Sequence, residues 1–337
     1  MSKYEIRPYR PGDEQGILQL FNIVFGEGDP AFVPRTLAQW RWEYAENPAG
    51  LHVTIAVDPR GDVVAQYACL PYFAQLGGER VVAHQGVDSI AHPEHRRGLK
   101  KEGVFLATAK AFFAQWGRPD RVAFGFGFPN KKVYRLGLRQ LDYVPVAAPV
   151  PTLHRNLFQK PDDDEVGGAE LADQVIELAA CDAAVDALWR RCQPDHQLAL
   201  IRDAAYLRWR YLQCPYGPYR IHALPGADGS LRGLIATRQD WMGPPIFAIA
   251  DWLVPAADEA ALARLLRFAV ARARAAGQQR VETWMPASSP HRRAILARGF
   301  GEEPCHYNLC VKMYRPSLTL EWMKQHWYYT IGDADVF

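Results

Sequence analysis

The sequence lacks the cysteine patterns and the charge excess that mark several classes of protein. It has six cysteines, with no C-x-x-C pair and no partner histidine motif, which argues against a zinc site and a disulfide framework. Its 39 basic and 37 acidic residues almost cancel, so no global field favours nucleic acid or a membrane surface. We therefore expect reduced thiols, no bound metal and no nucleic-acid partner.

Long apolar runs are also missing. Nowhere do 18 uncharged apolar residues follow one another, and the first residues, Met1–Arg7, do not contain the apolar core of a signal peptide. These absences predict a cytoplasmic protein without membrane insertion. What the chain does have is 49% apolar content over 337 residues, enough for two compact domains with a core each.

An aromatic signature occurs twice. Four residues recur at identical spacing: Trp42, Tyr44, Pro48 and Gly50 match Trp209, Tyr211, Pro215 and Gly217. The segments that follow keep a similar offset, so that Asp88 matches Asp251 and Pro93 matches Pro255. This pattern indicates a duplicated domain. Large aromatics at this spacing favour core anchors between a helix and a hairpin, with a substrate-stacking role as the alternative.

Apolar periodicity predicts the same order of elements in both copies. In the first copy we expect strands at 4–9, 53–57, 63–71, 74–76, 80–90 and 122–126, and helices at 17–25, 37–44, 104–113 and 130–141. In the second we expect strands at 219–224, 229–237, 247–254 and 281–285, and helices at 258–276 and 291–298. We place the first domain at 1–158, an acidic linker at 159–173, the second domain at 174–316 and a docked aromatic tail at 317–337.

A basic turn distinguishes the first copy from the second. The segment His92–Gly103, between a strand and the long helix, holds four cations within six residues and two glycines. Glycines permit close backbone approach and a helix N-terminus offers free N–H groups, so this segment can cradle a diphosphate. The alternative is a solvated basic turn. The matching segment Pro255–Ala261 is acidic and has no glycine, so the fold itself does not require the cations.

Three segments resemble the GNAT (GCN5-related) N-acetyltransferases. The segment Ala91–Gly98 resembles the family's acetyl-CoA-binding motif, a strand, then V-x-P-x-x-R-G-x-G-x-G/A, then a helix. The segment Gly127–Tyr143 resembles its N…Y…L-G-F element, and Tyr4–Asp13 resembles its opening. The resemblance implies an α/β (α+β) fold class: two tandem GNAT-like acyl-CoA N-acyltransferase domains, each a mixed, mostly antiparallel sheet flanked by helices. It also implies acetyl-CoA, or another acyl-CoA, as co-substrate.

The resemblance further implies which residues of the first copy bind the cofactor. A splayed strand end would hold the pantetheine arm, the basic turn would hold the diphosphate, and the last helix would begin at a contacting asparagine. These residues are Ser89, Ile90, Ala91, Arg96, Arg97, Gly98, Leu99, Lys100, Lys101 and Asn130. The turn departs from the family motif, because Leu99–Glu102 separate Gly98 from the next glycine.

Three residues are candidates for proton transfer. Asp88 lies five residues before Pro93, where many family members keep an acid, although its match Asp251 also favours a structural role. His84, on the same predicted strand, is expected to share the face of Asp88 and is a candidate base or relay, with a role in neither as the alternative. The family's usual tyrosine is replaced by leucine, so Tyr134, one helical turn earlier, is the candidate acid, with packing as the alternative.

The leading hypothesis is an N-acyltransferase that transfers acetyl from acetyl-CoA to a primary amine of a small molecule, such as an amino sugar or amino-acid derivative. Direct attack in a ternary complex is expected, with the first copy binding acyl-CoA and a degenerate second copy shaping the acceptor cleft. One alternative donor is an acyl-carrier protein, which Lys100 and Lys101 would contact. Another alternative is a non-catalytic scaffold that has lost the cradle. The oligomeric state stays open, with a homodimer among the options.

Overall fold

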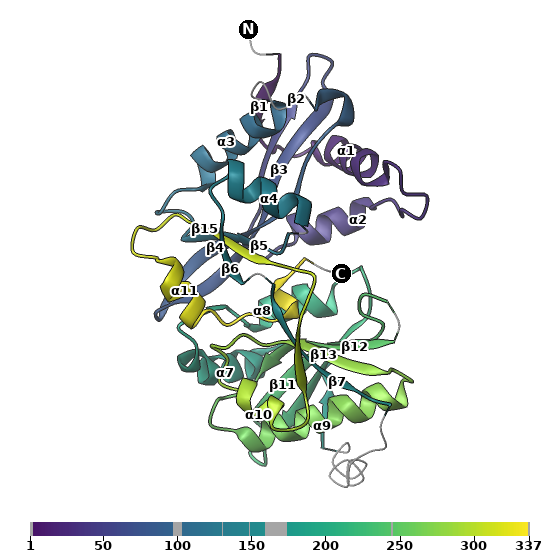
Figure 1. Ribbon diagram of the computed structural model, residues 1–337, viewed down its shortest axis with the longest axis vertical. Helices are drawn as coiled ribbons and strands as arrows, with labels where there is room; N and C mark the ends of the chain where they lie inside the picture. Colours follow the sequence, from purple (N-terminus) through teal and green to yellow (C-terminus); the bar gives the residue numbers. More distant parts are fainter. Residues whose placement is uncertain are drawn as a thin grey trace. The chain divides into compact units, whose positions relative to one another are not determined.

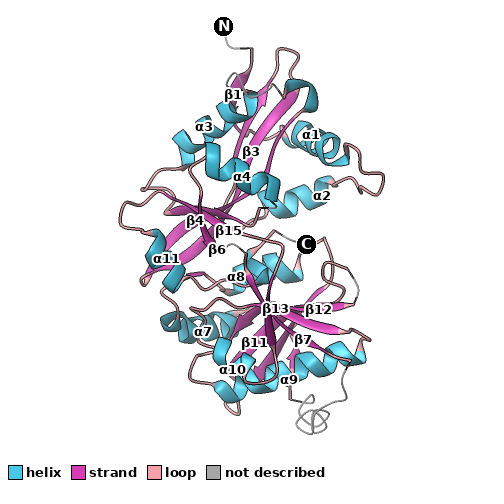
Figure 2. Ribbon diagram, in the orientation of Figure 1, coloured by secondary structure: helices cyan, strands magenta, loops and turns pink. Residues whose placement is uncertain are grey.

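The structure of the protein, a computed structural model, describes residues 3–96, 103–129, 131–147, 149–158, 174–243 and 245–335. It forms two compact units. The first unit comprises Met1–Phe73, Val81–Gly127 and Val311–Leu318, and the second comprises Ala74–Arg80, Phe128–Cys310 and Thr319–Phe337. Each unit contains a sheet with helices packed against it (Figures 1 and 2).

The first sheet has the strand order β1-β2-β3-β4-β5-β15-β6, with β9 pairing the end of β3. Its strands are β1 (Glu5–Pro8), β2 (His52–Val57), β3 (Val63–Leu76), β4 (Glu79–Ala91), β5 (Phe124–Gly127), β6 (Val144–Ala147), β9 (Leu198–Leu200) and β15 (Leu309–Met313). The accompanying helices are α1 (Glu14–Gly26), α2 (Leu37–Trp40), the π-helical turn η1 (Arg41–Ala45), the 3-10 turn η2 (Pro93–His95) and α3 (Val104–Trp116). Helix α4 (Lys131–Gln140) follows β5 along the chain and belongs to the second unit. Helices α1 and α2 lie on one side of this sheet and α3 lies on the other (Figure 1).

Burial and capping explain why these residues form these elements. Every residue of β2 is buried, as expected for a strand covered on both faces. Helix α1 buries a stripe of Ile17, Leu20 and Phe21. Helix α2 starts at a capping box in which Thr36 and Gln39 satisfy each other's backbone N–H groups.

The second sheet has the order β14-β7-β13-β12-β11-β10-β8. Its strands are β7 (Pro151–Asn156), β8 (Ile176–Glu177), β10 (Tyr219–Pro225), β11 (Leu231–Arg238), β12 (Ile246–Leu253), β13 (Arg280–Trp284) and β14 (Gly301–Pro304). The helices are α7 (Ala183–Cys192), η3 (Gln193–Asp195), α8 (Ala204–Leu207), the π-helical turn η4 (Arg208–Leu212), α9 (Glu259–Ala275), α10 (Arg292–Leu296), α11 (Leu320–His326) and η5 (Ile331–Asp333). Asp258 caps α9 by accepting from the N–H of Ala261, and the apolar face of α9 is buried.

The two sheets exchange one strand each. Strand β7 follows β6 along the chain, yet it pairs antiparallel with β13 and β14 in the second sheet. Strand β15 ends the second copy, yet it lies between β5 and β6 in the first sheet. Each copy therefore completes its sheet with a strand from the other copy.

The predicted fold class is confirmed, because both sheets are mixed and mostly antiparallel and are flanked by helices. Two details were wrong: β3 is one continuous strand from 63 to 76, and the helix expected at 37–44 becomes π-helical after Trp40. The buried Trp42, Tyr44, Trp209 and Tyr211 confirm the predicted core anchors. The predicted linker, 159–173, lies outside the described residues, and the domain boundaries stay a prediction. No helix in the described part of the chain is both long and apolar enough to span a bilayer.

Candidate functional site

The end of β4 separates from its neighbour in the sheet. Parallel pairing with β5 runs from Ala83 opposite Phe124 to Gln85 opposite Phe126, whereas β4 itself continues to Ala91. The strand stretch Gly86–Ala91 therefore extends beyond its pairing with β5. The predicted cofactor residues Ser89, Ile90 and Ala91 all lie on this stretch.

A bulge at Asp88 sets which side chains of β4 share a face. Asp88 has φ of 44°, in the left-handed region that non-glycine residues rarely adopt. Before it, His84 contacts Phe112 of α3, and after it Ile90 packs on α1 residues such as Phe21. Asp88 itself bonds to Tyr44, on the α1 and α2 side. The prediction that His84 and Asp88 share a face is wrong, because the bulge shifts the alternation by one residue.

A polar cluster holds this bulge. The Asp88 carboxylate accepts a 2.7 Å hydrogen bond from the Tyr44 hydroxyl and forms an ion pair with Arg35. Arg35 also lies 3.4 Å from the Glu43 carboxylate, and its guanidinium stacks on Phe21. Burial, followed by the charge of Asp88, raises the pKa of Tyr44 well above its usual value. The cluster thus contains a protonated tyrosine, one arginine and two carboxylates.

The second copy repeats the cluster. Asp251 accepts from Tyr211 at 2.8 Å and from Arg202 Nε at 2.7 Å. Arg35 and Arg202 each stand seven residues before the tryptophan of the signature. Sequence reasoning missed both arginines, although this shared spacing is a signal that could have found them. Because the copy without a basic turn has the same triad, the geometry favours a structural role for Asp88.

His84 lies inside the first core. It is 0% exposed, and its Nε2 is 2.9 Å from the Tyr314 hydroxyl. Burial lowers the pKa of His84 well below its usual value, so the ring is neutral at pH 7. A Cβ on Gly125 would lie 2.7 Å from the same Nε2, which shows how tightly the ring is packed. The structure therefore gives His84 a packing environment, not an open one.

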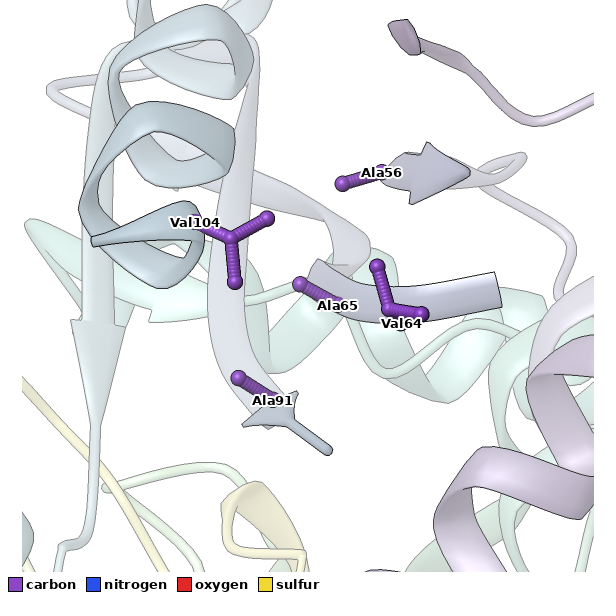
Figure 3. Close-up of a cluster of buried hydrophobic side chains, with 5 residues drawn as sticks. All are labelled: Ala56, Val64, Ala65, Ala91 and Val104. Atoms are coloured by element: carbon purple, nitrogen blue, oxygen red, sulfur yellow. The ribbon is translucent and has the colours of Figure 1, made fainter. Parts of the chain in front are cut away.

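The start of α3 follows closely on the end of β4. Ala91 and Val104 belong to one buried cluster with Ala56, Val64 and Ala65 (Figure 3). Gly103 is the N-cap of α3 and supplies no side-chain hydrogen bond to the helix. Helix N–H groups that no side chain caps are suited to an anion.

Arg96 is engaged at the strand end. Its Nε donates to the Ala91 carbonyl at 2.9 Å and its Nη1 pairs with Glu27 at 3.0 Å. The other residues of the predicted cradle, Arg97, Gly98, Leu99, Lys100 and Lys101, lie outside the described residues, as does Asn130.

Tyr134 lies on α4, in the second unit, and is partly exposed. Burial, followed by the charge of Cys310, raises the pKa of Tyr134, which keeps its phenol protonated at neutral pH. A protonated, accessible phenol can donate a proton to a leaving group.

The second copy fills the equivalent stretch with side chains. Pairing of β12 with β13 ends at Ala248 opposite Glu282, and β12 continues to Leu253. Beyond that point the Trp252 indole donates to Thr283 Oγ1 at 2.9 Å, and Thr283 donates to the Ile249 carbonyl. These side-chain contacts take the place of strand pairing.

A protein-family model matches most of the first copy. Residues 5–137 match the acetyltransferase (GNAT) domain. The first copy is a GNAT domain. The predicted resemblance is thereby confirmed for residues 5–137, and the match supports an acyltransferase enzyme. No curated protein matches the chain.

Solved structures share the fold over nearly the whole chain. A probable N-acyltransferase from Enterococcus faecalis V583 is 12% identical, with a TM-score of 0.66 over 93% of this chain and 73% of that one. A GCN5-related N-acetyltransferase from Anabaena variabilis is 13% identical, with a TM-score of 0.60 over 93% and 73%. Saccharomyces cerevisiae N-myristoyltransferase with bound myristoyl-CoA is 13% identical, with a TM-score of 0.56 over 94% and 80%. The GNAT fold thus extends beyond the residues that the family model matches.

Proposed function

We propose that this protein is an N-acyltransferase that moves an acyl group, most simply acetyl, from an acyl-CoA to the primary amine of a small molecule. An amino sugar or an amino-acid derivative is the expected acceptor. The observation that carries the proposal is the end of β4 inside the GNAT domain, where Gly86–Ala91 extend past the pairing with β5. Strand N–H and C=O groups can bind the two amides of a pantetheine arm as an added strand would.

The residues at the end of β4 and at the start of α3 can bind two different parts of an acyl-CoA. Ser89, Ile90 and Ala91 offer main-chain groups for pantetheine, and the uncapped start of α3 offers N–H groups for a diphosphate. Arg96 fixes the carbonyl of Ala91, so we assign it to holding the strand end. We assign charge neutralisation to Arg97, Lys100 and Lys101, with Asn130 as a further contact by family resemblance.

The reaction requires two proton movements. The thioester supplies an activated carbonyl carbon, the amine nitrogen forms a bond to it and loses one proton to water, and the bond to sulfur breaks, so that the leaving thiolate takes up one proton. By family resemblance we assign the protonation of the leaving thiolate to Tyr134, whose phenol is protonated at neutral pH. We assign Asp88 to positioning, because its carboxylate already accepts from Tyr44 and Arg35. The burial of His84 supports packing in place of proton transfer.

The second copy is proposed to have no acyl-CoA site. Its turn Pro255–Ala261 is acidic, and Trp252 of β12 bonds through its side chain to Thr283 of β13 beyond the point where the two strands stop pairing. The Asp258 carboxylate already accepts from the Ala261 N–H at the start of α9, so this helix end is capped by an anion of the chain itself. This asymmetry supports a single site for each chain, in the first copy.

A comparison of two donors tests the proposal. We would assay transfer to a panel of primary amines with acetyl-CoA and with S-acetylpantetheine, which lacks the diphosphate. For Lys100→Ala with Lys101→Ala we expect the KM for acetyl-CoA to rise roughly tenfold or more, because hydrogen bonds to charged groups are lost, while kinetics with S-acetylpantetheine stay unchanged. Arg118→Ala is the matched control, because Arg118 forms a solvent-exposed ion pair with nearby Asp120.

Two results would overturn the proposal. The first is the absence of both thiol release and thermal stabilisation by millimolar acetyl-CoA in the folded protein. The second is an equal rise of KM for both donors, which would mean that the basic turn does not recognise the diphosphate.

A further inference from the structure

The chain's own C-terminal segment, Thr330–Ala334, completes the charge cluster of the second copy. Arg202 Nε holds Asp251 at 2.7 Å, and Arg202 Nη2 holds both oxygens of Asp333 at 2.8 and 3.0 Å. The side chains of Arg202, Asp251 and Asp333 are each 1% exposed. The Thr330 hydroxyl adds a 3.2 Å hydrogen bond to Asp251. Asp333 is thus recognised by two N–H···O contacts from one guanidinium, deep inside the second unit.

The main chain of the segment is recognised as well. Arg210 donates from Nε to the Gly332 carbonyl at 3.0 Å and from Nη2 to the Ala334 carbonyl at 2.8 Å. The Tyr206 hydroxyl donates to the Gly332 carbonyl at 3.3 Å. A Cβ on Gly332 would lie 1.9 Å from the Tyr211 hydroxyl, so the cluster admits only glycine here. The lack of room for a Cβ selects the glycine, and the charge of Arg202 selects the aspartate. The hydrogen bonds from Arg210 recognise the main chain.

Comparison with the first copy shows why the segment is needed. In the first copy the second carboxylate next to Arg35 is Glu43, from the adjacent π-helical turn. At the matching position the second copy has Arg210. A buried arginine in place of a buried acid requires another carboxylate nearby. Asp333, 131 residues after Arg202, supplies it.

We propose that the space between β12 and η4 is a binding site for a short acidic peptide segment containing Gly-Asp, and that Thr330–Ala334 occupies this site as an intramolecular ligand. The chemistry that selects the ligand is a carboxylate for Arg202, two carbonyl groups for Arg210 and a residue without Cβ against Tyr211. The site is distinct from the acyl-CoA stretch of the first copy and does not depend on the proposed reaction.

Hydrogen exchange on the full chain tests whether the segment is a ligand or part of the core. The amides of Tyr328, Thr330, Asp333 and Ala334 are all hydrogen-bonded. For Arg210→Met we expect at least a tenfold loss of protection at these amides, with β11 and β12 unchanged, because the segment opens as a unit of its own. The matched control is Arg208→Met, because Arg208 lies in the same turn but donates to the Cys181 carbonyl. Equal loss of protection in the segment and in β11 and β12 would overturn the proposal.

Exchange of the segment in trans gives a second test. A protease site introduced at the exposed turn Pro316–Ser317 allows the folded full chain to be cut, leaving its C-terminal peptide in place. We expect an isotope-labelled synthetic peptide of residues 318–337 to replace the cut peptide. The same peptide with Asp333→Asn or Gly332→Ala is expected to compete roughly tenfold or more weakly, because charged hydrogen bonds or shape are lost. Equal competition by all three peptides would refute selection by Gly-Asp, and so would a cut peptide that leaves only when the protein unfolds.

Discussion

His52 links the stability of the first core to pH. It stacks on Trp116 with ring centroids 3.9 Å apart, and its Nδ1 has no hydrogen-bond partner among the described residues. Burial, followed by the charge of Arg121, lowers the pKa of His52 to about 4. An unfolded histidine titrates at about 6.5, so the unfolded state takes up the proton first as pH falls. The contribution of His52 to stability is therefore complete above pH 6.5 and is lost toward pH 4.

We expect His52→Phe to reduce this pH dependence. Phenylalanine keeps the stacking and cannot titrate, so the variant should lose about 2 kcal/mol less than the wild type between pH 7 and pH 5. Urea unfolding at the two pH values measures the difference. Identical losses in both proteins would show that His52 does not contribute to the pH dependence.

Two glycines should respond oppositely to alanine. A Cβ on Gly125 would lie 2.7 Å from His84 Nε2 and 3.0 Å from the Tyr314 hydroxyl. We expect Gly125→Ala to cost about 1–3 kcal/mol through overpacking. Gly137, inside α4, has its nearest neighbour 3.7 Å from such a Cβ, so Gly137→Ala should gain up to about 1 kcal/mol of helix propensity. Thermal unfolding of both variants compares them, and a shift in the same direction would contradict the packing argument.

Tyr134→Phe separates chemistry from packing. Tyr134 is partly exposed, so removal of its hydroxyl should change the melting temperature little. If it protonates the leaving thiolate, kcat should fall by about 10²-fold or more with the KM for acyl-CoA unchanged. An unchanged kcat would show that Tyr134 has a packing role and does not protonate the thiolate.

Single residues also show how far the sequence could predict the site. The duplicated signature located Tyr44 and Asp88 together with their matches, because repetition reveals positions that both copies require. It did not reveal that Arg35 bonds to Asp88, since spacing alone does not show how far a side chain reaches. It also missed the left-handed backbone of Asp88, which reversed the expected facing of His84.

At the scale of elements, the two arginine clusters provide a comparison within one chain. Arg202 is 1% exposed and Arg35 is 10% exposed at the side chain. We expect Arg202→Met to cost about 3–5 kcal/mol, because removing one partner of a buried ion pair leaves its carboxylates uncompensated. Arg35→Met should cost less, because the side chains of Arg35 and Asp88 are 10% and 9% exposed and keep some contact with water. Only Arg35→Met should raise the KM for acyl-CoA, since only it supports β4; an equal effect of both variants on KM would indicate general destabilisation.

Most elements could be predicted because periodicity reports burial directly. Helix α9 and strands β10 to β13 lie within a few residues of their expected ranges. The π-helical turns η1 and η4 could not be predicted, because the apolar spacing of one π turn resembles that of an α-helix. The pairing partners of β7 and β15 could not be predicted either. Both are short strands, and nothing in their residues indicates which sheet they join.

At the scale of the whole molecule, the strand exchange predicts that the two copies cannot be separated by cutting the chain between them. A protease site placed within residues 159–173 would leave β7 on the first fragment and β15 on the second. Because each fragment supplies an inner strand of the other's sheet, we expect the fragments to co-elute in gel filtration until denaturant is added. The first fragment expressed alone should fail to give a cooperative unfolding transition. Separate, folded fragments would contradict the exchanged topology.

The same topology determines when the first sheet can be completed during translation. A ribosome delivers the chain from its N-terminus, and an N-terminal domain ordinarily folds while the rest is still being synthesised. Here β5 and β6 remain without their intervening strand until residues 309–313 have emerged. The GNAT domain is therefore completed only after residues 309–313 have emerged, and until then its sheet has an open edge that a chaperone or a neighbouring chain could bind.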